Sequence, residues 1–229
     1  MTYVLHYAPD NASLIVRLAL DTLGQSFSTH LVDRSTESQR APTYLALNPN
    51  GLIPTLITPD GPLFETGAIL LWLVDRHSDL GPAVPDPSRA DFLKWLFFCS
   101  NTVHAQMTLL FYPHKLVGDD ALLQRAVQSG AQTNLRTHFQ TLNAADTHAF
   151  GQDQPTVIDF YIAAMLRWCA LYGPPDRAWF CLEDTPALAQ LCRRVEALPA
   201  TAKARATEGL GPTPFTAPRR PTPPEGSAL

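Results

Sequence analysis

The residues with the clearest chemical potential lie in one short stretch, 48–66. Pro54 has no backbone N–H, and if its bond to Ile53 is cis, the chain turns outward before the next strand. The N–H and C=O of Ile53 are then free to pair with an extended ligand. Glu65 and Thr66 precede a helical pattern, where unpaired N–H groups and the helix dipole attract a carboxylate. A glutamate beside that anion site can hold an ammonium group, so the stretch predicts a pocket for a small peptide-like ligand with an α-amino acid end.

The elements expected around this pocket form a small mixed sheet with helices. The first strand, helix and strand follow one another within about thirty residues, which predicts a parallel β–α–β unit. The expected order is βαβαββα: strand 3–8, helix 14–23, strand 27–32, a weak helix at 40–47, two short strands joined by the turn at residues 59–62, and a helix to about residue 77.

Strand patterns end after this point, and the remaining chain reads as helical. The expected domains are residues 1–78, a linker at 79–88, an all-helical domain at 89–208 and a Pro-rich tail at 209–229. Its expected helices are 89–112, 119–148, 156–172 and 185–206. The third is almost wholly apolar and begins with Thr156 and Asp159, which form a capping-box pattern and a folding signal. The tail has six prolines from residue 212 onward, and we expect an arm or a disordered end.

The composition and charge of the chain limit the classes of protein to which it can belong. The chain has 229 residues, 45% of them apolar and 17% charged, with a net charge of −4, so we expect a globular protein rather than a disordered or nucleic-acid-binding one. No secretory leader pattern opens the chain and no apolar run has the length of a membrane span, which favours a soluble cytoplasmic protein. The four cysteines are widely spaced and predict free thiols, and neither they nor the histidines show metal-ligand spacing.

Taken together, these motifs resemble the cytosolic glutathione S-transferase family of bacterial type. The resemblance rests on the stretch 48–56, on Glu65-Thr66 and on the Thr156-x-x-Asp159 motif, and it covers residues 3 to about 206. It implies a thioredoxin-like N-terminal domain, an all-α C-terminal domain and glutathione as the co-substrate, without a metal. It also implies that Ile53, before Pro54, pairs with the cysteinyl part of glutathione, and that Glu65 and Thr66 bind its γ-glutamyl end.

The group that activates the thiol is open at this stage. Members of the family place a hydrogen-bond donor at the end of the first strand or the start of the first helix, where it lowers the thiol pKa. Position 12, where a bacterial cysteine is expected, holds Ala12, and Asp10 lies where a serine is expected, so that a carboxylate beside a thiolate would oppose its ionisation. Ser13 and Asn11 are the favoured donors, and Tyr7 is their rival.

The second substrate is expected between the domains, against the first long helix. His104, Phe111 and Tyr112 are the candidate contacts, and His104 has an imidazole that can donate to a thiolate or product. The resemblance implies a homodimer that acts in detoxification by joining glutathione to small electrophiles. Glutathione-dependent peroxide or disulfide reduction is an alternative, as is a non-catalytic glutathione-binding or regulatory protein of the same fold.

Overall fold

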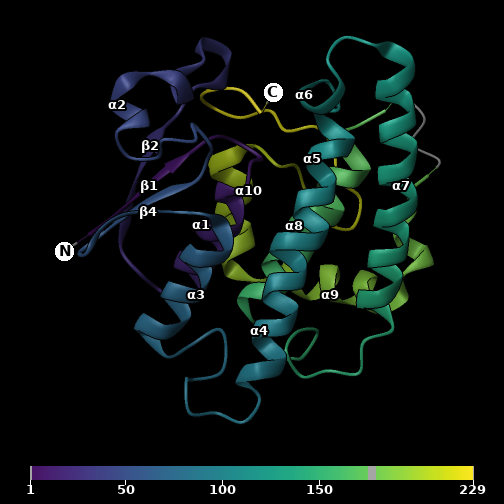
Figure 1. The fold of residues 1–229 in the computed structure, drawn as a ribbon. Coiled ribbons are helices and arrows are strands. Elements are labelled where there is room, and N and C mark those ends of the chain that lie inside the picture. Colours follow the sequence, from purple (N-terminus) through teal and green to yellow (C-terminus); the bar gives the residue numbers. More distant parts are fainter. Residues whose placement is uncertain (1, 175–178, 229) are drawn as a thin grey trace.

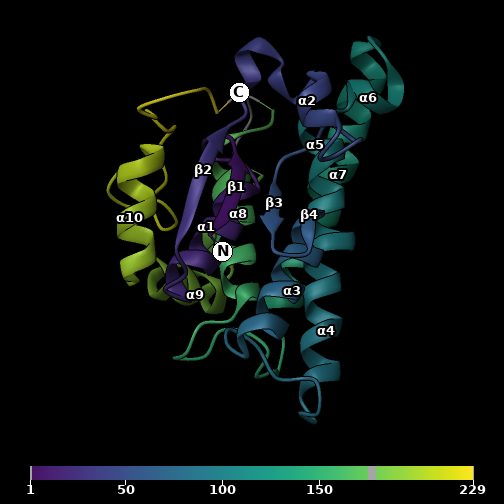
Figure 2. The same ribbon diagram turned by 90° about the vertical axis from the view of Figure 1, so that its left-hand side faces the viewer.

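A four-stranded sheet forms the N-terminal half of the protein. The computed structural model describes residues 2–174 and 179–228. The strands are β1 (Tyr3–Tyr7), β2 (Phe27–Leu31), β3 (Thr55–Thr58) and β4 (Gly61–Phe64), and their order in the sheet is β2-β1-β3-β4 (Figure 2). β1 and β2 are parallel, whereas β3 is antiparallel to both β1 and β4. The predicted parallel β–α–β unit is therefore confirmed.

Three α-helices accompany the sheet: α1 (Ser13–Thr22), α2 (Pro42–Leu45) and α3 (Thr66–His77), with two short 3-10 turns, η1 (Arg34–Thr36) and η2 (Ser38–Arg40), before α2. The predicted order βαβαββα is confirmed. α1 contacts α3 on one side and the C-terminal helices α8 and α10 on the others. Residues 13–20 of α1 are consequently all buried, because the helix is covered on every face.

The C-terminal half is helical, as predicted. Its elements are α4 (Arg89–Phe97), η3 (Phe98–His104), α5 (Ala105–Phe111), α6 (His114–Val117), α7 (Ala121–Asn143), α8 (Val157–Leu171), η4 (Leu182–Asp184), α9 (Pro186–Ala197) and α10 (Pro199–Glu208) (Figure 1). The first long helix is continuous from α4 through α5, but its middle part, η3, is a π-helix. Such i→i+5 segments widen the helix locally and often lie at functional sites.

Two predicted helix boundaries are wrong. The helix expected to reach residue 148 ends at Asn143, whose side-chain oxygen accepts a 2.9 Å hydrogen bond from the N–H of Ala187. The helix expected over 185–206 is two helices, because Pro199 has no N–H to continue the first one and forces Leu198 into extended backbone with ψ of 144°.

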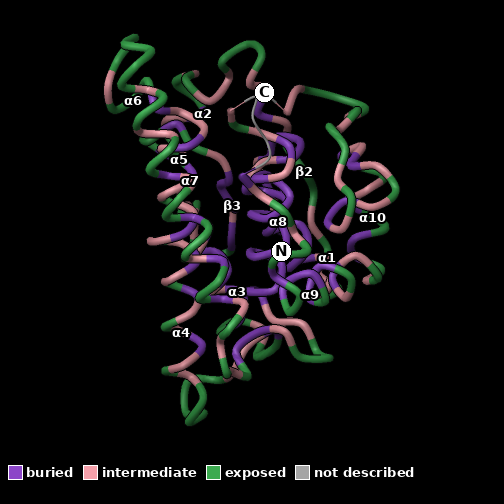
Figure 3. Tube along the Cα trace, turned by 90° about the vertical axis from the view of Figure 1, so that its right-hand side faces the viewer, coloured by how far each residue is buried: buried purple, intermediate pink, exposed green. Residues whose placement is uncertain are grey.

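Helix α8 is the centre of the core. All of its residues except Ala170 are buried (Figure 3). The expected capping box is present: Thr156 Oγ1 accepts from the N–H of Ile158, and an Asp159 carboxylate oxygen accepts from the N–H of Thr156 at 2.8 Å. The other carboxylate oxygen of Asp159 accepts from the N–H of Gly151 at 2.8 Å. The folding role predicted for this motif is therefore confirmed.

The Pro-rich tail does not form the free arm that its composition suggested. It packs along the body of the protein, and Phe215 is buried against the core. Glu196 on α9 accepts hydrogen bonds from the N–H groups of Phe215 and Thr216, at 2.8 and 3.0 Å. The buried ring of Phe215 and the hydrogen bonds to Glu196 hold this segment in place. The number of prolines does not reveal these contacts.

Candidate functional site

The loop before β3 is folded by its own polar side chains. The carbonyl oxygen of Leu52 accepts from Tyr44 Oη at 2.6 Å and from Asn48 Nδ2 at 2.8 Å, while Asn48 Oδ1 accepts from the N–H of Asn50. Gly51 has a φ of +61°, and a Cβ at this position would lie 2.8 Å from the carbonyl oxygen of Gln39. Only glycine fits both the left-handed backbone and this close approach.

The tied loop presents the backbone of Ile53 at the start of β3. The bond between Ile53 and Pro54 is cis, which is the condition stated from the sequence. Ile53 is half-buried and Pro54 is buried. Within the described residues, the N–H and C=O of Ile53 make no hydrogen bond, so both groups remain available to an extended ligand.

Glu65 and Thr66 form the start of α3. Glu65 is exposed and has φ 69° and ψ 113°, a conformation that L-residues rarely adopt. Backbone held in such a region costs about 1–3 kcal/mol and clusters at ligand-binding sites. Thr66 is buried at the first turn of this twelve-residue helix, whose N–H groups and dipole favour an anion.

The strand register brings these two parts together. Thr55 is paired with His6 on β1 and with Phe64 on β4. Ile53 precedes Thr55 by two residues, and Glu65 directly follows Phe64, so both lie at the same edge of the sheet. The end of β1 reaches that edge as well, which places Tyr7 beside them.

The three candidate thiol-activating residues have different surroundings. Ser13 is fully buried, and its hydroxyl donates to the carbonyl of Ala8 at 3.0 Å and accepts from the N–H of Ala8 at 3.3 Å. Asn11 is half-buried, its Oδ1 accepts from the N–H of Ala12 at 2.8 Å, and its side-chain NH₂ makes no hydrogen bond within the described residues. The Tyr7 hydroxyl donates to Glu225 in the tail.

The electrostatics of Tyr7 keep its hydroxyl protonated. Burial raises the pKa of Tyr7, and the hydrogen bond to the Glu225 carboxylate raises it further. The guanidinium of Arg17 lies 4.8 Å from the centre of the Tyr7 ring and acts in the opposite direction, but the first two effects are larger. Tyr7 is therefore a neutral donor at physiological pH.

Asp10 does not face the position expected for a thiolate, contrary to the expectation from the sequence. Its carboxylate is fully buried and turned toward α8, where Arg167 donates to it from Nε at 2.8 Å and from Nη2 at 2.9 Å. Trp168 Nε1 and Tyr172 Oη add two more donors, at 3.1 and 2.5 Å. The negative charge is thus paired with a guanidinium, and Asp10 fixes the β1–α1 turn to the helical half.

A second buried ion pair holds the same turn from the other side. Glu208, the last residue of α10, accepts from the N–H of Asp10 at 2.9 Å and from Arg17 Nε at 2.7 Å. Burial raises the pKa of Glu208, whereas the charge of Arg17 lowers it. The β1–α1 turn that carries Asn11 is therefore clamped between α8 and α10.

His104 lies in the π-helix and turns toward α8. Its Nδ1 lies 2.9 Å from Tyr161 Oη, and its ring is tilted against that of Trp168 at 5.6 Å. Burial lowers the pKa of His104 to about 4, so the imidazole is neutral at physiological pH. The charge of Glu65 contributes to the raised pKa of Tyr161, which places the His104–Tyr161 pair near the start of α3.

Phe111 and Tyr112 end the first long helix as parts of an aromatic group. The Phe111 ring is 6.5 Å from that of Tyr112 and 6.4 Å from that of Tyr172, in edge-to-face geometry. Tyr112 Oη accepts from Arg34 Nη2 at 3.0 Å, and this hydrogen bond joins the helical half to the N-terminal half. The structure therefore groups Phe111 with Tyr112, while His104 is committed to Tyr161.

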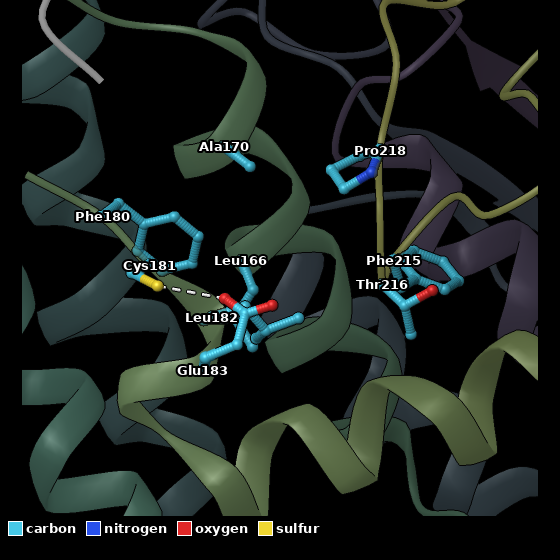
Figure 4. Close-up of a pocket in the computed structure, with 9 residues that line it drawn as sticks. All are labelled: Leu166, Ala170, Phe180, Cys181, Leu182, Glu183, Phe215, Thr216 and Pro218. Atoms are coloured by element: carbon cyan, nitrogen blue, oxygen red, sulfur yellow. Dashed lines mark hydrogen bonds between the residues drawn. The ribbon is translucent and has the colours of Figure 1, made fainter. Parts of the chain in front are cut away.

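One cavity of about 220 Å³ lies apart from these residues. Figure 4 shows it between α8, the segment around η4 and the tail, and Cys181 Sγ there donates to Glu183 at 3.0 Å. It contains none of the residues expected at the ligand site. Within the described parts of the chain, no group of three or more histidine, cysteine, aspartate or glutamate side chains is placed to hold a metal ion. No helix of residues 2–174 or 179–228 combines the length and apolar content that crossing a bilayer requires.

Comparison with known proteins identifies the family. Residues 1–75 match the model of the glutathione S-transferase N-terminal domain. A glutathione S-transferase, GST-4.5, from Xanthomonas campestris pv. campestris is 32% identical over 180 residues, which cover 74% of this chain and 83% of the relative. The chain belongs to the glutathione S-transferase family. Its fold is the family's, an N-terminal thioredoxin-like domain followed by a helical domain.

Two solved glutathione S-transferase structures support this assignment. The enzyme from Xylella fastidiosa has a TM-score of 0.76 and 28% identity, over 91% of this chain and 100% of that one. A sphingomonad glutathione S-transferase complexed with glutathione has a TM-score of 0.73 and 27% identity, with the same coverage. The resemblance derived from the motifs is confirmed.

Sequence reasoning missed several residues that shape the site. Arg34, Arg167 and Glu225 are separated from their partners by 78 to 218 positions, so no local spacing reveals them. Gly67 carried a weak signal, because a small residue follows Thr66 directly. A Cβ on Gly67 would lie 3.2 Å from Ser100 Cβ, so α3 and the π-helix approach closely there.

Proposed function

We propose that this protein is a glutathione transferase. Its glutathione site is formed by Ile53, Pro54, Glu65 and Thr66, which lie at one end of the sheet. The free backbone groups of Ile53 suit the cysteinyl part, and the start of α3 suits the α-carboxylate of the γ-glutamyl part. Glu65 is exposed beside that helix start, where its carboxylate can bind the α-ammonium. One observation carries the proposal: the unpaired backbone groups of Ile53 lie at the same end of the sheet as the start of α3.

The reaction proposed is attack of the glutathione thiolate on a small electrophile. Rate enhancement comes from stabilising the thiolate and positioning the two reactants, and needs no metal. Among residues 2–174 and 179–228, the side-chain NH₂ of Asn11 has no hydrogen-bond acceptor, whereas the hydroxyls of Ser13 and Tyr7 are occupied. Asn11 is therefore the first choice among the three donors, and the other two stay in the proposal as candidates that need a rearrangement to act.

The second substrate is proposed to lie against Phe111 and Tyr112. Their rings offer an apolar surface at the end of α5, next to Tyr172. His104 enters the proposal as a group that shapes this region through Tyr161, because its Nδ1 is already in use. A homodimer, a cytoplasmic location and a role in detoxification stay predictions that rest on the family alone.

Replacing Glu65 tests the binding site. Glu65→Ala removes a charge-assisted contact worth about 1.5–3 kcal/mol, so we expect the dissociation constant for glutathione, measured by calorimetry, to rise about 10- to 100-fold. Asp60→Ala is the control, since it removes an exposed carboxylate from the turn at the other end of β4. Equal affinities for Glu65→Ala and the unmodified protein would show that the ligand site has been placed wrongly.

Turnover separates conjugation from the alternatives. Consumption of a chloronitrobenzene with glutathione supports transferase chemistry, whereas turnover of a peroxide or disulfide alone supports reduction by the same thiolate. Binding of glutathione without turnover of either would indicate a binding or regulatory protein.

A further inference from the structure

The end of the tail lies where the sheet and the helical half of the protein meet. In Figure 1 the yellow C-terminal chain runs above the sheet and ends between α2 and α6. Its earlier part is anchored: the carbonyl oxygens of Pro214 and Arg219 accept from Arg167 at 2.9 and 3.1 Å, and the N–H of Thr222 donates to the carbonyl of Gly209 at 2.9 Å. The last residues after this anchor, 223–228, are here called the strap.

The strap contacts Tyr7, the candidate thiol-activating residue that lies beside the glutathione site proposed above. The carboxylate of Glu225 accepts a hydrogen bond from the Tyr7 hydroxyl at the end of β1. Gly226 lies so close to β2 that a Cβ on it would be 2.7 Å from Leu31 Cδ1. The carbonyl oxygen of Ala228 accepts from Arg34 Nη1 at 2.8 Å, and the same guanidinium donates to Tyr112. The strap therefore contacts β1 at Tyr7 and β2 at Leu31. Through Arg34 it is also linked to Tyr112, directly after α5.

A carboxylate on Tyr7 conflicts with a thiolate at the same edge. The Tyr7 hydroxyl has one hydrogen to donate, and Glu225 uses it. Glutathione bound at Ile53 would bring its own thiolate and carboxylates to this edge, next to the negative charge of Glu225. Like charges at short distance repel each other, so glutathione is expected to bind less tightly while the strap is docked.

Undocking of the strap is expected to cost little free energy. None of residues 223–228 is buried, in contrast to Phe215 in the anchored part of the tail. Strap residues line a cavity of about 200 Å³ together with Tyr172, Arg220 and Pro221. Segments with few buried contacts open locally at a small fraction of the global unfolding free energy.

We propose that the strap is an intramolecular competitor of glutathione, which occupies Tyr7 through Glu225 and is displaced when glutathione binds. This inference rests on the proposed function. The apparent affinity for glutathione is then reduced by the fraction of molecules in which the strap is undocked. The carboxylate of Glu225 accepts the Tyr7 hydrogen bond that the glutathione thiolate would otherwise accept.

Two variants test the strap in the full protein. One ends the chain after Thr222, which keeps Phe215 and the Thr222–Gly209 hydrogen bond, and the other is Glu225→Ala. Glu183→Gln is the control, because it alters an exposed glutamate in η4, at a cavity that no strap residue lines. If the strap is docked in about ten of eleven molecules, both test variants bind glutathione about tenfold more tightly in calorimetry, and the control is unchanged.

Limited proteolysis reports on the strap directly. We expect a glutamate-specific protease to cut after Glu225 faster when the unmodified protein is saturated with glutathione. Equal or weaker affinity of the shortened chain, or slower cutting of the strap with glutathione bound, overturns the competitor role and leaves the proposed function standing. Failure of both the full and the shortened chain to bind glutathione overturns the proposed function, and the inference with it.

Discussion

The buried pair of Asp10 and Arg167 allows a quantitative test of how the two halves are joined. Asp10→Asn keeps the shape of the side chain but removes its charge, and leaves the Arg167 guanidinium at zero exposure without a counter-charge. Removing one partner of a buried pair typically destabilises by about 3–5 kcal/mol, because the remaining charge is desolvated and uncompensated. We expect a loss of this size in the free energy of unfolding, measured in urea as a lower midpoint.

The chain offers a matched control for this substitution. Asp21 also lies on α1 and pairs with Lys203 of α10 at 3.1 Å, but the lysine is 63% exposed. Because exposed pairs contribute about 0–1 kcal/mol, Asp21→Asn is expected to change stability by less than 1 kcal/mol. The double variant Asp10→Asn with Arg167→Met should be less destabilised than the sum of the two single variants. A loss below 1 kcal/mol for Asp10→Asn, equal to that of the control, would refute the reasoning.

Two further predictions concern Asn11, the proposed hydrogen-bond donor to the thiolate, and the imidazole of His104. Asn11→Ala is expected to lower kcat/KM at neutral pH about 10- to 100-fold and to move the pH–rate profile to higher pH, because the thiolate loses a donor; a larger loss in Ser13→Ala or Tyr7→Phe would reassign that role. His104 has a pKa of about 4 in the folded protein against 6.5 for the free side chain, so the unfolded chain binds more protons between these values. Stability from this residue is therefore complete above pH 6.5 and falls by up to about 3 kcal/mol as the pH drops to 4. Urea unfolding of His104→Gln across this range should show a weaker pH dependence, and an unchanged slope would contradict the assignment.

The sequence predicts what is encoded locally. The strand at residues 3–8, the turn at residues 59–62 and the capping box at Thr156 each involve neighbours within a few positions, and all three appear in the structure. A short hairpin also brings Ile53 and Glu65 to the same end of the sheet, whereas the ligand predicted for them stays a prediction.

The features that sequence reasoning missed depend on distant partners. The carboxylate of Asp10 is turned by donors 157 to 162 residues away, so its direction is set by packing rather than by its neighbours. The tail was misjudged for the same reason: its prolines describe a stiff chain, whereas the path of its anchored part, up to Thr222, is fixed by Phe215 and Arg167. The break before Pro199 is the exception, because a proline inside a helical pattern is a local signal.

The covering of α1 has a consequence for the autonomy of the N-terminal domain. A fragment ending near residue 78 would expose the faces of α1 that α8 and α10 cover, and would leave Asp10 and Arg17 without Arg167 and Glu208. Such a fragment lacks part of its own core, although it contains the whole sheet. The two domains of this protein are therefore expected to fold and to unfold as one cooperative unit, so that neither can be exchanged for a foreign counterpart without redesigning the faces of α1.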